Sequence, residues 1–444
     1  MTPEQAVFSY VTQQSGSRRY CVAFSGGMDS HALLLLMTQL RDQDRSLTLR
    51  ALHIDHGLQP QSADWARHVA DVCSSLNVPF EIRHANIDAT LKSGPEAQAR
   101  LARYSEFSAS LLEDEHLLLA QHAEDQAETF LLQALRGSGP DGLAAIPRKR
   151  RFANGFMGRP LLNCSKESLR AVAVESGLNW IEDPSNADMR FDRNYLRHKV
   201  MPLLSERWPA ASETLSRSAM RSAAASQSLM TVAQEDLQTI RIKGTTELSL
   251  AAIRKLPRER AFTALRLYVR QRGLRMPRLQ DLVQVMSDLV NARPDSAGLV
   301  NVRDYVFRRH RNSLYLLPPV SSPEPFRYSW EAPFKPLTIV ETGLTLTVET
   351  CLEQGIALPD SGSIGVKSRA GGELIKLGQP AYHKAVKKLL QESSVPPWIR
   401  DSIPLLYING RLAAVWNIAV AVDARTIDEQ PAELSGSLES LEQL

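Results

Sequence analysis

Short apolar runs alternate with stretches of helical periodicity over about the first 205 residues, and this alternation restricts the fold more than any other feature. Runs of strand length lie at 20–24, 47–54, 79–84 and 116–120, and stretches of helical length at 30–40, 62–76, 95–112 and 124–135. Such alternation predicts an α/β domain, with a parallel sheet covered by helices on both faces. Because ligands of these sheets bind beyond the carboxyl ends of the strands, we expect the functional residues there.

A glycine-rich loop, SGGMDS at 25–30, follows the first strand and precedes the first helix. Its glycines allow the backbone to approach a ligand, and the free N–H groups of a helix start favour an oxyanion. The Walker pattern GxxxxGK[ST] is absent from the sequence, which excludes a P-loop kinase or GTPase. SGGxDS resembles the signature of the PP-loop, or N-type ATP pyrophosphatase, superfamily, whose members cleave ATP between the α and β phosphates. The resemblance predicts ATP binding by Ser25, Gly26, Gly27, Met28, Asp29 and Ser30.

In this interpretation Asp29 is also catalytic and holds Mg²⁺ at the phosphates. The end of the second strand supplies His53, Asp55 and His56, which we expect to contact the nucleotide. A purely polar strand end is the alternative, and a metal site would need further ligands that the nearby sequence does not offer.

The fourth strand is followed by an acidic helix start, in which Asp125 and Glu128 are three residues apart and share one face. One interpretation is that these acids simply stabilise the helix N-terminus. The other is a carboxylate pair that holds a cationic substrate or Mg²⁺.

Several longer blocks resemble the tRNA(Ile)-lysidine synthase family and span nearly the whole chain except the acidic tail. The blocks are HIDHGL at 53–58, EAQARLARY at 96–104, a segment at 121–147 beginning QHAEDQAE, RPLL at 159–162, a segment at 179–204 beginning NWIEDPSN, and one at 369–407 beginning RAGGELIK. The chain departs from the family pattern at Gln379-Pro380, where an arginine is usual.

The resemblance implies an ATP-dependent ligase that joins L-lysine to C2 of the wobble cytidine in the CAU-anticodon tRNA(Ile). An adenylated cytidine is the implied intermediate, pyrophosphate and AMP are released, and the tRNA changes from methionine to isoleucine specificity and reads AUA. It further implies that Asp125, which we also count as catalytic, and Glu128 bind lysine, and that Arg100 and Arg103 act on the phosphate or adenylate. An exposed helix face is the alternative for each arginine.

Basic residues are concentrated in parts of the chain, although the net charge is only +3. Residues 254–278 hold nine basic side chains and one acid, and residues 367–388 hold six and one. Such blocks suit a nucleic-acid backbone, although a charge run is more often a solvated face. The expected tRNA contacts are Arg193, Asn194, Arg197, Arg266, Arg270, Arg275, Arg369, Lys384, Lys387 and Lys388. For Arg193, Asn194 and Arg197 a structural hinge is an equal alternative.

The 444 residues predict about three domains, and 43% apolar with 23% charged residues is typical of a globular protein. We expect a PP-loop catalytic domain at 1–207, a helical tRNA-binding domain at 208–320, and a Pro-rich linker at 321–336. A small α+β tRNA-binding domain at 337–422 and a flexible acidic tail at 423–444 complete the chain. The sequence predicts no signal peptide or membrane span, which favours a cytoplasmic protein. We expect a monomer or a homodimer.

Three other functions are compatible with a PP-loop domain. A tRNA thiolase needs reactive cysteines, often in CxxC pairs, and the four cysteines are too far apart to form such a pair. An amidating synthetase of the NAD or GMP type needs an ammonia source, and no glutaminase-like module is evident. A catalytically inactive tRNA-binding protein would not need the intact SGGMDS loop.

Overall fold

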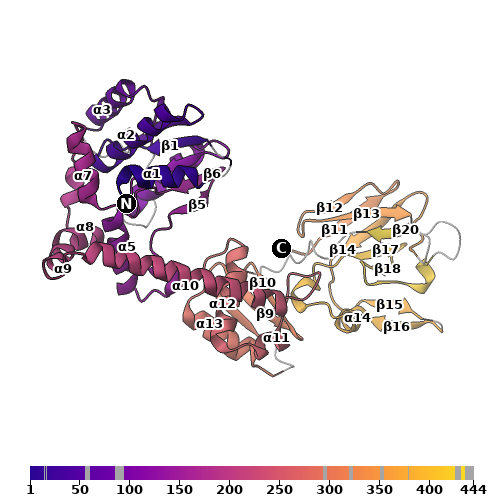
Figure 1. The fold of residues 1–444 in the computed structure, drawn as a ribbon. Helices are drawn as coiled ribbons and strands as arrows, with labels where there is room; N and C mark the ends of the chain where they lie inside the picture. The colour runs from indigo at the N-terminus through magenta and orange to yellow at the C-terminus, as the bar shows by residue number, and fades with distance from the viewer. Residues whose placement is uncertain are drawn as a thin grey trace. The chain divides into compact units, whose positions relative to one another are not determined.

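The structure is a computed structural model that divides into two compact units, Met1–Leu229 and Met230–Leu444 (Figure 1). It describes residues 1–14, 16, 18–55, 61–85, 95–293, 298–319, 324–350, 355–378, 380–425 and 432–435. His56, one of the expected nucleotide contacts, lies outside the described residues, as does Gln379. Within the described ranges, no helix combines the length and the apolar character needed to cross a membrane.

The first unit is built on a six-stranded sheet of order β3-β2-β1-β4-β6-β5, which is parallel except for the edge strand β5. This confirms the expected parallel-sheet domain. Its strands are β1 (Arg19–Ala23), β2 (Thr48–Asp55), β3 (Phe80–His84), β4 (His116–Leu118), β5 (Lys149–Phe152) and β6 (Gly155–Gly158).

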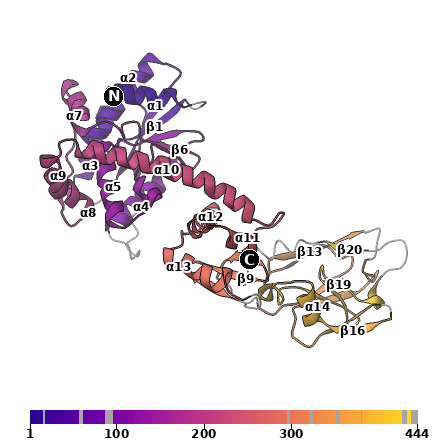
Figure 2. The same cartoon turned by 60° about the horizontal axis from the view of Figure 1, so that its bottom comes forward.

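Helices cover both faces of this sheet (Figure 2). Neighbouring residues of β1 therefore belong to two different apolar clusters, one on each face. Tyr20 and Val22 belong to a cluster that includes Leu33, Leu34 and other residues of α2. Cys21 belongs to a second cluster on the α4 side of the sheet. The main covering helices are α1 (Pro3–Thr12), α2 (Met28–Gln43), α3 (Ser62–Ser75), α4 (Pro95–Ser110), α5 (Ala123–Leu135) and α7 (Lys166–Glu175).

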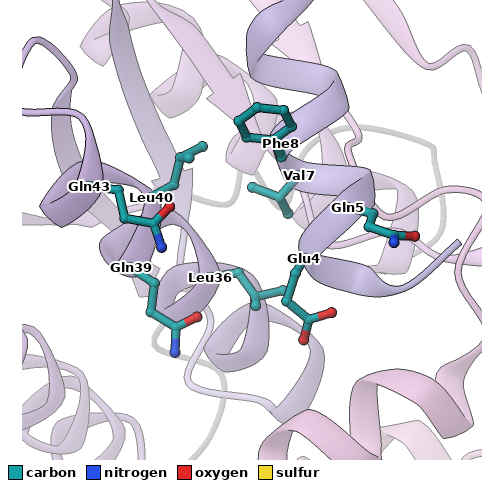
Figure 3. A pocket seen from close by; sticks show the side chains of 8 residues that line it. All are labelled: Glu4, Gln5, Val7, Phe8, Leu36, Gln39, Leu40 and Gln43. Atoms are coloured by element: carbon teal, nitrogen blue, oxygen red, sulfur yellow. The ribbon is translucent and has the colours of Figure 1, made fainter.

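A pocket between α1 and the carboxyl-terminal half of α2 is lined by the Glu4 carboxylate and by apolar and amide side chains, among them Phe8, Leu36 and Gln39 (Figure 3). The loop expected to bind phosphate lies at the opposite end of α2, since that helix begins at Met28. The pocket is therefore not where the expected chemistry takes place.

The second unit begins within the long helix α10 (Ala211–Ile240) and contains more β-structure than the helical domain expected at 208–320. Helices α11 to α13 surround a core with the sheet β7-β10-β9-β8. The elements are α11 (Leu250–Lys255), α12 (Arg258–Gln271), α13 (Leu279–Gln284), β7 (Leu248–Ser249), β8 (Leu299–Val302), β9 (Tyr305–His310) and β10 (Ser313–Leu317).

A five-stranded sheet of order β11-β14-β17-β18-β19 organises the C-terminal region. Strand β11 (Arg327–Glu331) lies inside the stretch expected to be a linker. This part of the stretch is folded, because Trp330 is buried and its indole N–H donates to the Lys335 carbonyl at 2.6 Å. Strand β20 (Ala432–Ser435) lies inside the expected flexible tail and pairs with β13. The remaining elements are β12 (Leu337–Ile339), β13 (Leu344–Thr350), β14 (Ser363–Lys367), β15 (Leu374–Leu377), β16 (Tyr382–Ala385), α14 (Val386–Glu392), β17 (Leu405–Ile408), β18 (Arg411–Val415) and β19 (Ala419–Val420).

The buried His116 makes the stability of the first unit depend on pH. Its ring is 1% exposed, and its Nδ1 lies 3.1 Å from the Tyr10 hydroxyl. Burial, assisted by the charge of Lys149, lowers the pKa of His116 to about 4. The unfolded chain therefore binds a proton first as the pH falls, so the stability is present above about pH 6.5 and is lost towards pH 4.

We predict that His116→Phe flattens this part of the pH–stability curve, which in the wild type falls by up to about 3 kcal/mol. Denaturant unfolding at several pH values measures the effect. His383→Phe, at an exposed position, is the matched control and should keep the wild-type slope. An unchanged slope in His116→Phe would show that other groups cause the dependence.

Candidate active site

The loop between β1 and α2 has the geometry of an anion cradle. Gly27 is the N-cap of α2, and within the described chain no side chain caps this helix end. The Ser25 and Ser30 hydroxyls lie 3.1 Å apart, and the Ser30 hydroxyl donates to the Gly27 carbonyl at 2.9 Å. The first N–H groups of α2 are thus left for a ligand, which is the arrangement that binds phosphate at helix N-termini.

Gly26 is held in place by a segment that lies far away in the sequence. Its φ of +82° favours glycine, and a Cβ at this position would lie 2.7 Å from Ile181 Cδ1. The Ile181 N–H donates to the Gly26 carbonyl at 3.0 Å. The segment after α7 therefore fixes the loop, although nothing in the sequence marked Ile181 as a site residue.

Asp29 lies in the first turn of α2 and has one carboxylate oxygen without a protein partner. Oδ2 is 3.6 Å from His122 Nε2, whereas Oδ1 is buried and accepts no hydrogen bond from any described residue. A buried, unsatisfied carboxylate oxygen fits a bound cation. Among the described residues no set of three or more His, Cys, Asp or Glu side chains forms a closed metal site. An Mg²⁺ ion here would therefore rely on phosphate and water for its other ligands, as is usual for this ion.

His122 connects the loop with α5. Its side chain is 3% exposed, with Nδ1 at 2.9 Å from Glu124 and Nε2 at 3.5 Å from Asp125. Burial alone would lower the pKa of His122, but the carboxylates of Asp29, Glu124 and Asp125 raise it to about 10. The imidazole is therefore a cation at neutral pH.

Asp125 and Glu128 form a buried ion-pair cluster with two arginines, which we name the tetrad: Asp125, Glu128, Arg193 and Arg197. Arg193 contacts Asp125 at 2.7 Å and Glu128 at 2.8 Å. Arg197 contacts Glu128 at 2.7 Å and Asp125 at 3.1 Å. The arginines come from α8 (Asp192–Tyr195) and the π-helical turn η2 (Leu196–Val200).

The tetrad thus joins the residues expected to bind lysine with two that were expected to contact tRNA. Burial raises the pKa of Asp125, but the charges of His122 and both arginines outweigh this, so the net shift is downward. Asn194, the third of that group, donates to the Asp188 carbonyl at 3.0 Å.

The site carries a surplus of negative charge. Counting only residues that the structure describes, its carboxylates are Asp29, Glu124, Asp125 and Glu128, and its cations are His122, Arg193 and Arg197. Four negative charges face three positive ones, so the arrangement can accept a further cation such as an ammonium group or Mg²⁺.

The two described residues at the end of β2 have protein partners. His53 is buried, and its Nδ1 lies 2.8 Å from the Phe24 carbonyl, directly before the glycine-rich loop. Burial lowers its pKa, so the ring is neutral. Asp55 lies 3.3 Å from His84 Nδ1. His53 therefore fixes the start of the loop, and its expected nucleotide contact stays a prediction.

A group of arginines surrounds Tyr104 on α4. The guanidinium of Arg100 lies 4.9 Å from the Tyr104 ring centroid, and that of Arg150 lies at 5.7 Å. Arg159, which is 3% exposed, donates to the Gln121 side chain at 2.5 Å and to the Pro147 carbonyl at 2.8 Å. Arg159 therefore holds the residue next to His122. The RPLL block at 159–162 contained this arginine, but no local pattern distinguished its role.

The expected tRNA-binding cations of the second unit differ in their surroundings. Arg369 pairs with Asp401 at 2.6 Å, and Lys384 pairs with Glu392. The other expected contacts are exposed or half-buried: Arg266, Arg270, Arg275, Lys387 and Lys388. Within the same basic block, Arg260 pairs with Asp236 at 2.5 Å and Arg254 donates to the Val290 carbonyl at 2.6 Å.

Three family models match the chain in order. A PP-loop domain matches residues 2–204, a TilS substrate binding domain residues 248–315, and a TilS substrate C-terminal domain residues 364–435. A tRNA(Ile)-lysidine synthase of Coxiella burnetii is 38% identical, and the match covers 93% of this chain and 92% of the relative. The chain belongs to the tRNA(Ile)-lysidine synthase family.

Two further relatives of the same name support this assignment. The one from Methylococcus capsulatus is 40% identical, covering 89% of this chain and 90% of its own, and the one from Serratia proteamaculans is 37% identical, covering 95% and 96%. A solved structure, the U34-tRNA thiolase NcsA from Methanococcus maripaludis with its [4Fe-4S] cluster, aligns with a TM-score of 0.42 and 14% identity, covering 49% of this chain and 76% of the thiolase.

Membership of the lysidine synthase family makes the chain an ATP-using ligase with a PP-loop catalytic domain. The described cysteines do not suit the chemistry of a thiolase, because all three are buried. Burial raises the pKa of Cys73 to about 12 and that of Cys164 to about 11, and it raises the pKa of Cys21 as well. Their thiolate forms are therefore scarce at neutral pH.

Replacement of Gly26 tests the contact between the loop and Ile181. Gly26→Ala should destabilise the fold by about 2–4 kcal/mol, since it adds a steric clash to the cost of a positive φ. Gly177→Ala is the matched control, because Gly177 also has a positive φ, +61°, but has open space around it. It should cost only about 1–2 kcal/mol. Equal losses in denaturant unfolding would mean that Ile181 gives way without cost.

Proposed function

We propose that this chain ligates L-lysine to C2 of the wobble cytidine of the CAU-anticodon tRNA(Ile), using ATP and releasing pyrophosphate and AMP. The modified tRNA would change from methionine to isoleucine specificity and would decode AUA. The observation that carries the proposal is the short path from the phosphate loop, through Asp29 and His122, to the tetrad. In this proposal the nucleotide-activating site and the site for the charged amino acid would be adjacent.

In the first step, the C2 oxygen of cytosine attacks the α-phosphorus of ATP. A bond forms between that oxygen and phosphorus, the α–β phosphoanhydride bond breaks, and pyrophosphate leaves. The N–H groups at the start of α2 would hold the departing phosphates, aided by Ser25 and Ser30. Arg100 and Arg103 are our candidates for charge stabilisation at the adenylate.

In the second step, the lysine ε-amine attacks C2, the C2–oxygen bond breaks and AMP leaves with the oxygen. The attacking nitrogen gives up a proton, because only the neutral amine is a nucleophile. The tetrad would bind the amino acid: its carboxylates suit an ammonium group and its guanidinium groups suit the lysine carboxylate. The negative surplus of the site supports binding of a cation rather than an anion.

Asp29 would hold Mg²⁺ through its unsatisfied Oδ1, and the ion would supply charge neutralisation at the phosphates. The expected tRNA contacts that are exposed, Arg270, Arg275, Lys387 and Lys388, would lie against the phosphate backbone. A cytoplasmic monomer or homodimer fits the proposed role.

Incorporation of labelled lysine tests the proposed function. The protein is incubated with ATP, Mg²⁺, radiolabelled lysine and the CAU tRNA(Ile) transcript, and label in the tRNA is measured together with released pyrophosphate. We expect one pyrophosphate to be released for each lysine that enters the tRNA. The methionine tRNA, which has the same anticodon, is the control and should accept little label. Absence of label in tRNA(Ile) would refute the proposed ligation.

Two isosteric variants separate the steps. Asp29→Asn removes the proposed ligand of Mg²⁺ and should slow pyrophosphate release by about a hundredfold or more. Glu128→Gln leaves the loop intact, so it should raise the KM for lysine about tenfold while pyrophosphate release continues. Each variant is the control for the other. Parallel loss of both products in Glu128→Gln would contradict its assignment to lysine.

A further inference from the structure

Several cations meet within the second unit, where the β9–β10 hairpin contacts the segment after α14. His310 Nε2 lies 3.1 Å from the Ser394 carbonyl, and Arg311 donates to the Gln391 carbonyl at 2.8 Å and to the Ser394 hydroxyl. We name Arg308, Arg311 and Arg400, together with His310, the junction cluster. Arg308 and His310 both lie next to Trp398.

Arg308 is the least compensated member of the junction cluster. Its Nε is buried and has no hydrogen-bond partner among the described residues. Its guanidinium lies 5.3 Å from the centroid of the Trp398 ring. Burial lowers the pKa of Arg308, which shows that the surroundings disfavour its charge. A buried, charged donor without a partner is unfavourable, and an anionic ligand would supply the missing acceptor.

The other cations of the junction cluster are close enough to repel one another. Burial and the charges of Arg369 and Arg311 lower the pKa of Arg400, while Asp401 opposes them. The carboxylate of Asp401 is already engaged by Arg369, with contacts of 2.6 and 3.1 Å. Among the described residues, the junction cluster therefore carries more positive than negative charge, and it is partly buried.

We propose that the junction cluster is a binding site for a phosphate group, with the guanidinium groups of Arg308, Arg311 and Arg400 as its donors. Guanidinium groups match phosphate in geometry, and an anion would relieve both the missing hydrogen bond and the like-charge repulsion. The phosphate can come from the tRNA backbone or from free inorganic phosphate. The first source rests on the proposed function, which makes tRNA the substrate.

Basic runs in the sequence did not reveal this site. Arg308, Arg311 and Arg400 all lie outside the blocks at 254–278 and 367–388. They are brought together by the contact between the hairpin and residues 391–400. The aromatic rings of Tyr315 and Trp398, with centroids 5.0 Å apart, form the apolar side of the same junction.

Arg308→Met in the full-length protein tests the site, because methionine keeps much of the side-chain length and removes the charge. Binding of the CAU tRNA(Ile) is measured over a range of salt concentrations, and thermal unfolding is followed with and without inorganic phosphate. We expect about tenfold weaker tRNA binding and a salt slope smaller by about one. Without phosphate, the variant should unfold at the same or a higher temperature than the wild type.

Arg327→Met is the matched control, since Arg327 is exposed on β11 and outside the cluster. It should retain the tRNA affinity. Stabilisation of the wild type by inorganic phosphate, lost in Arg308→Met while tRNA binding is unchanged, would assign the site to free phosphate. Wild-type tRNA affinity, salt slope and phosphate response in Arg308→Met would overturn the proposal. A wild type that binds tRNA but transfers no lysine would refute the proposed function and leave this site standing.

Discussion

The catalytic unit depends on one buried arrangement of charge, in which His122 lies between the carboxylate of the phosphate loop and those of α5. The sheet makes this arrangement possible, because β1 and β4 are neighbouring parallel strands and their carboxyl ends meet. Asp29 follows one strand and His122 the other. The positive charge of His122 between Asp29, Glu124 and Asp125 offsets part of the cost of removing these carboxylates from water. The residues that balance the buried charge are therefore the same ones that we propose bind the ligands.

The sequence predicted the strands and helices of the first unit well, since their hydrophobic periodicity is local. Helices α1 and α7 and strands β5 and β6 escaped prediction. The residues of β5, Lys149–Phe152, are mostly basic and carry no apolar alternation. The loop at 25–30 and the carboxylates of α5 were predicted as site residues from short motifs, and the fold brings them to either side of His122. The arginine partners of those carboxylates were not predicted. Arg193 is 68 residues from Asp125, and only the folded chain brings them together.

Charge counts along the sequence were a poor guide to which cations are available for binding. In the block at 254–278, Arg260 is taken up by Asp236 and Arg254 by the Val290 carbonyl, so these residues hold the fold. Arg308 lies in no such block and yet lacks a partner for its buried Nε in the described structure. Burial and pairing decide whether a cation is structural or available, and neither can be read from the spacing of residues.

The tetrad and the junction cluster are opposite solutions to the burial of arginine. Arg193 and Arg197 each contact two carboxylates, so their charges are neutralised before any ligand binds, and they can orient a substrate without repelling its ammonium group. Arg308 faces an aromatic ring, and its buried Nε has no partner among the described residues, so an anion would supply the missing acceptor. A paired arginine therefore suits recognition of a zwitterionic amino acid, whereas an unpaired one suits recognition of a phosphate. The same side chain would suit two kinds of ligand, because the fold gives Arg193 and Arg197 carboxylate partners and gives the Nε of Arg308 none among the described residues.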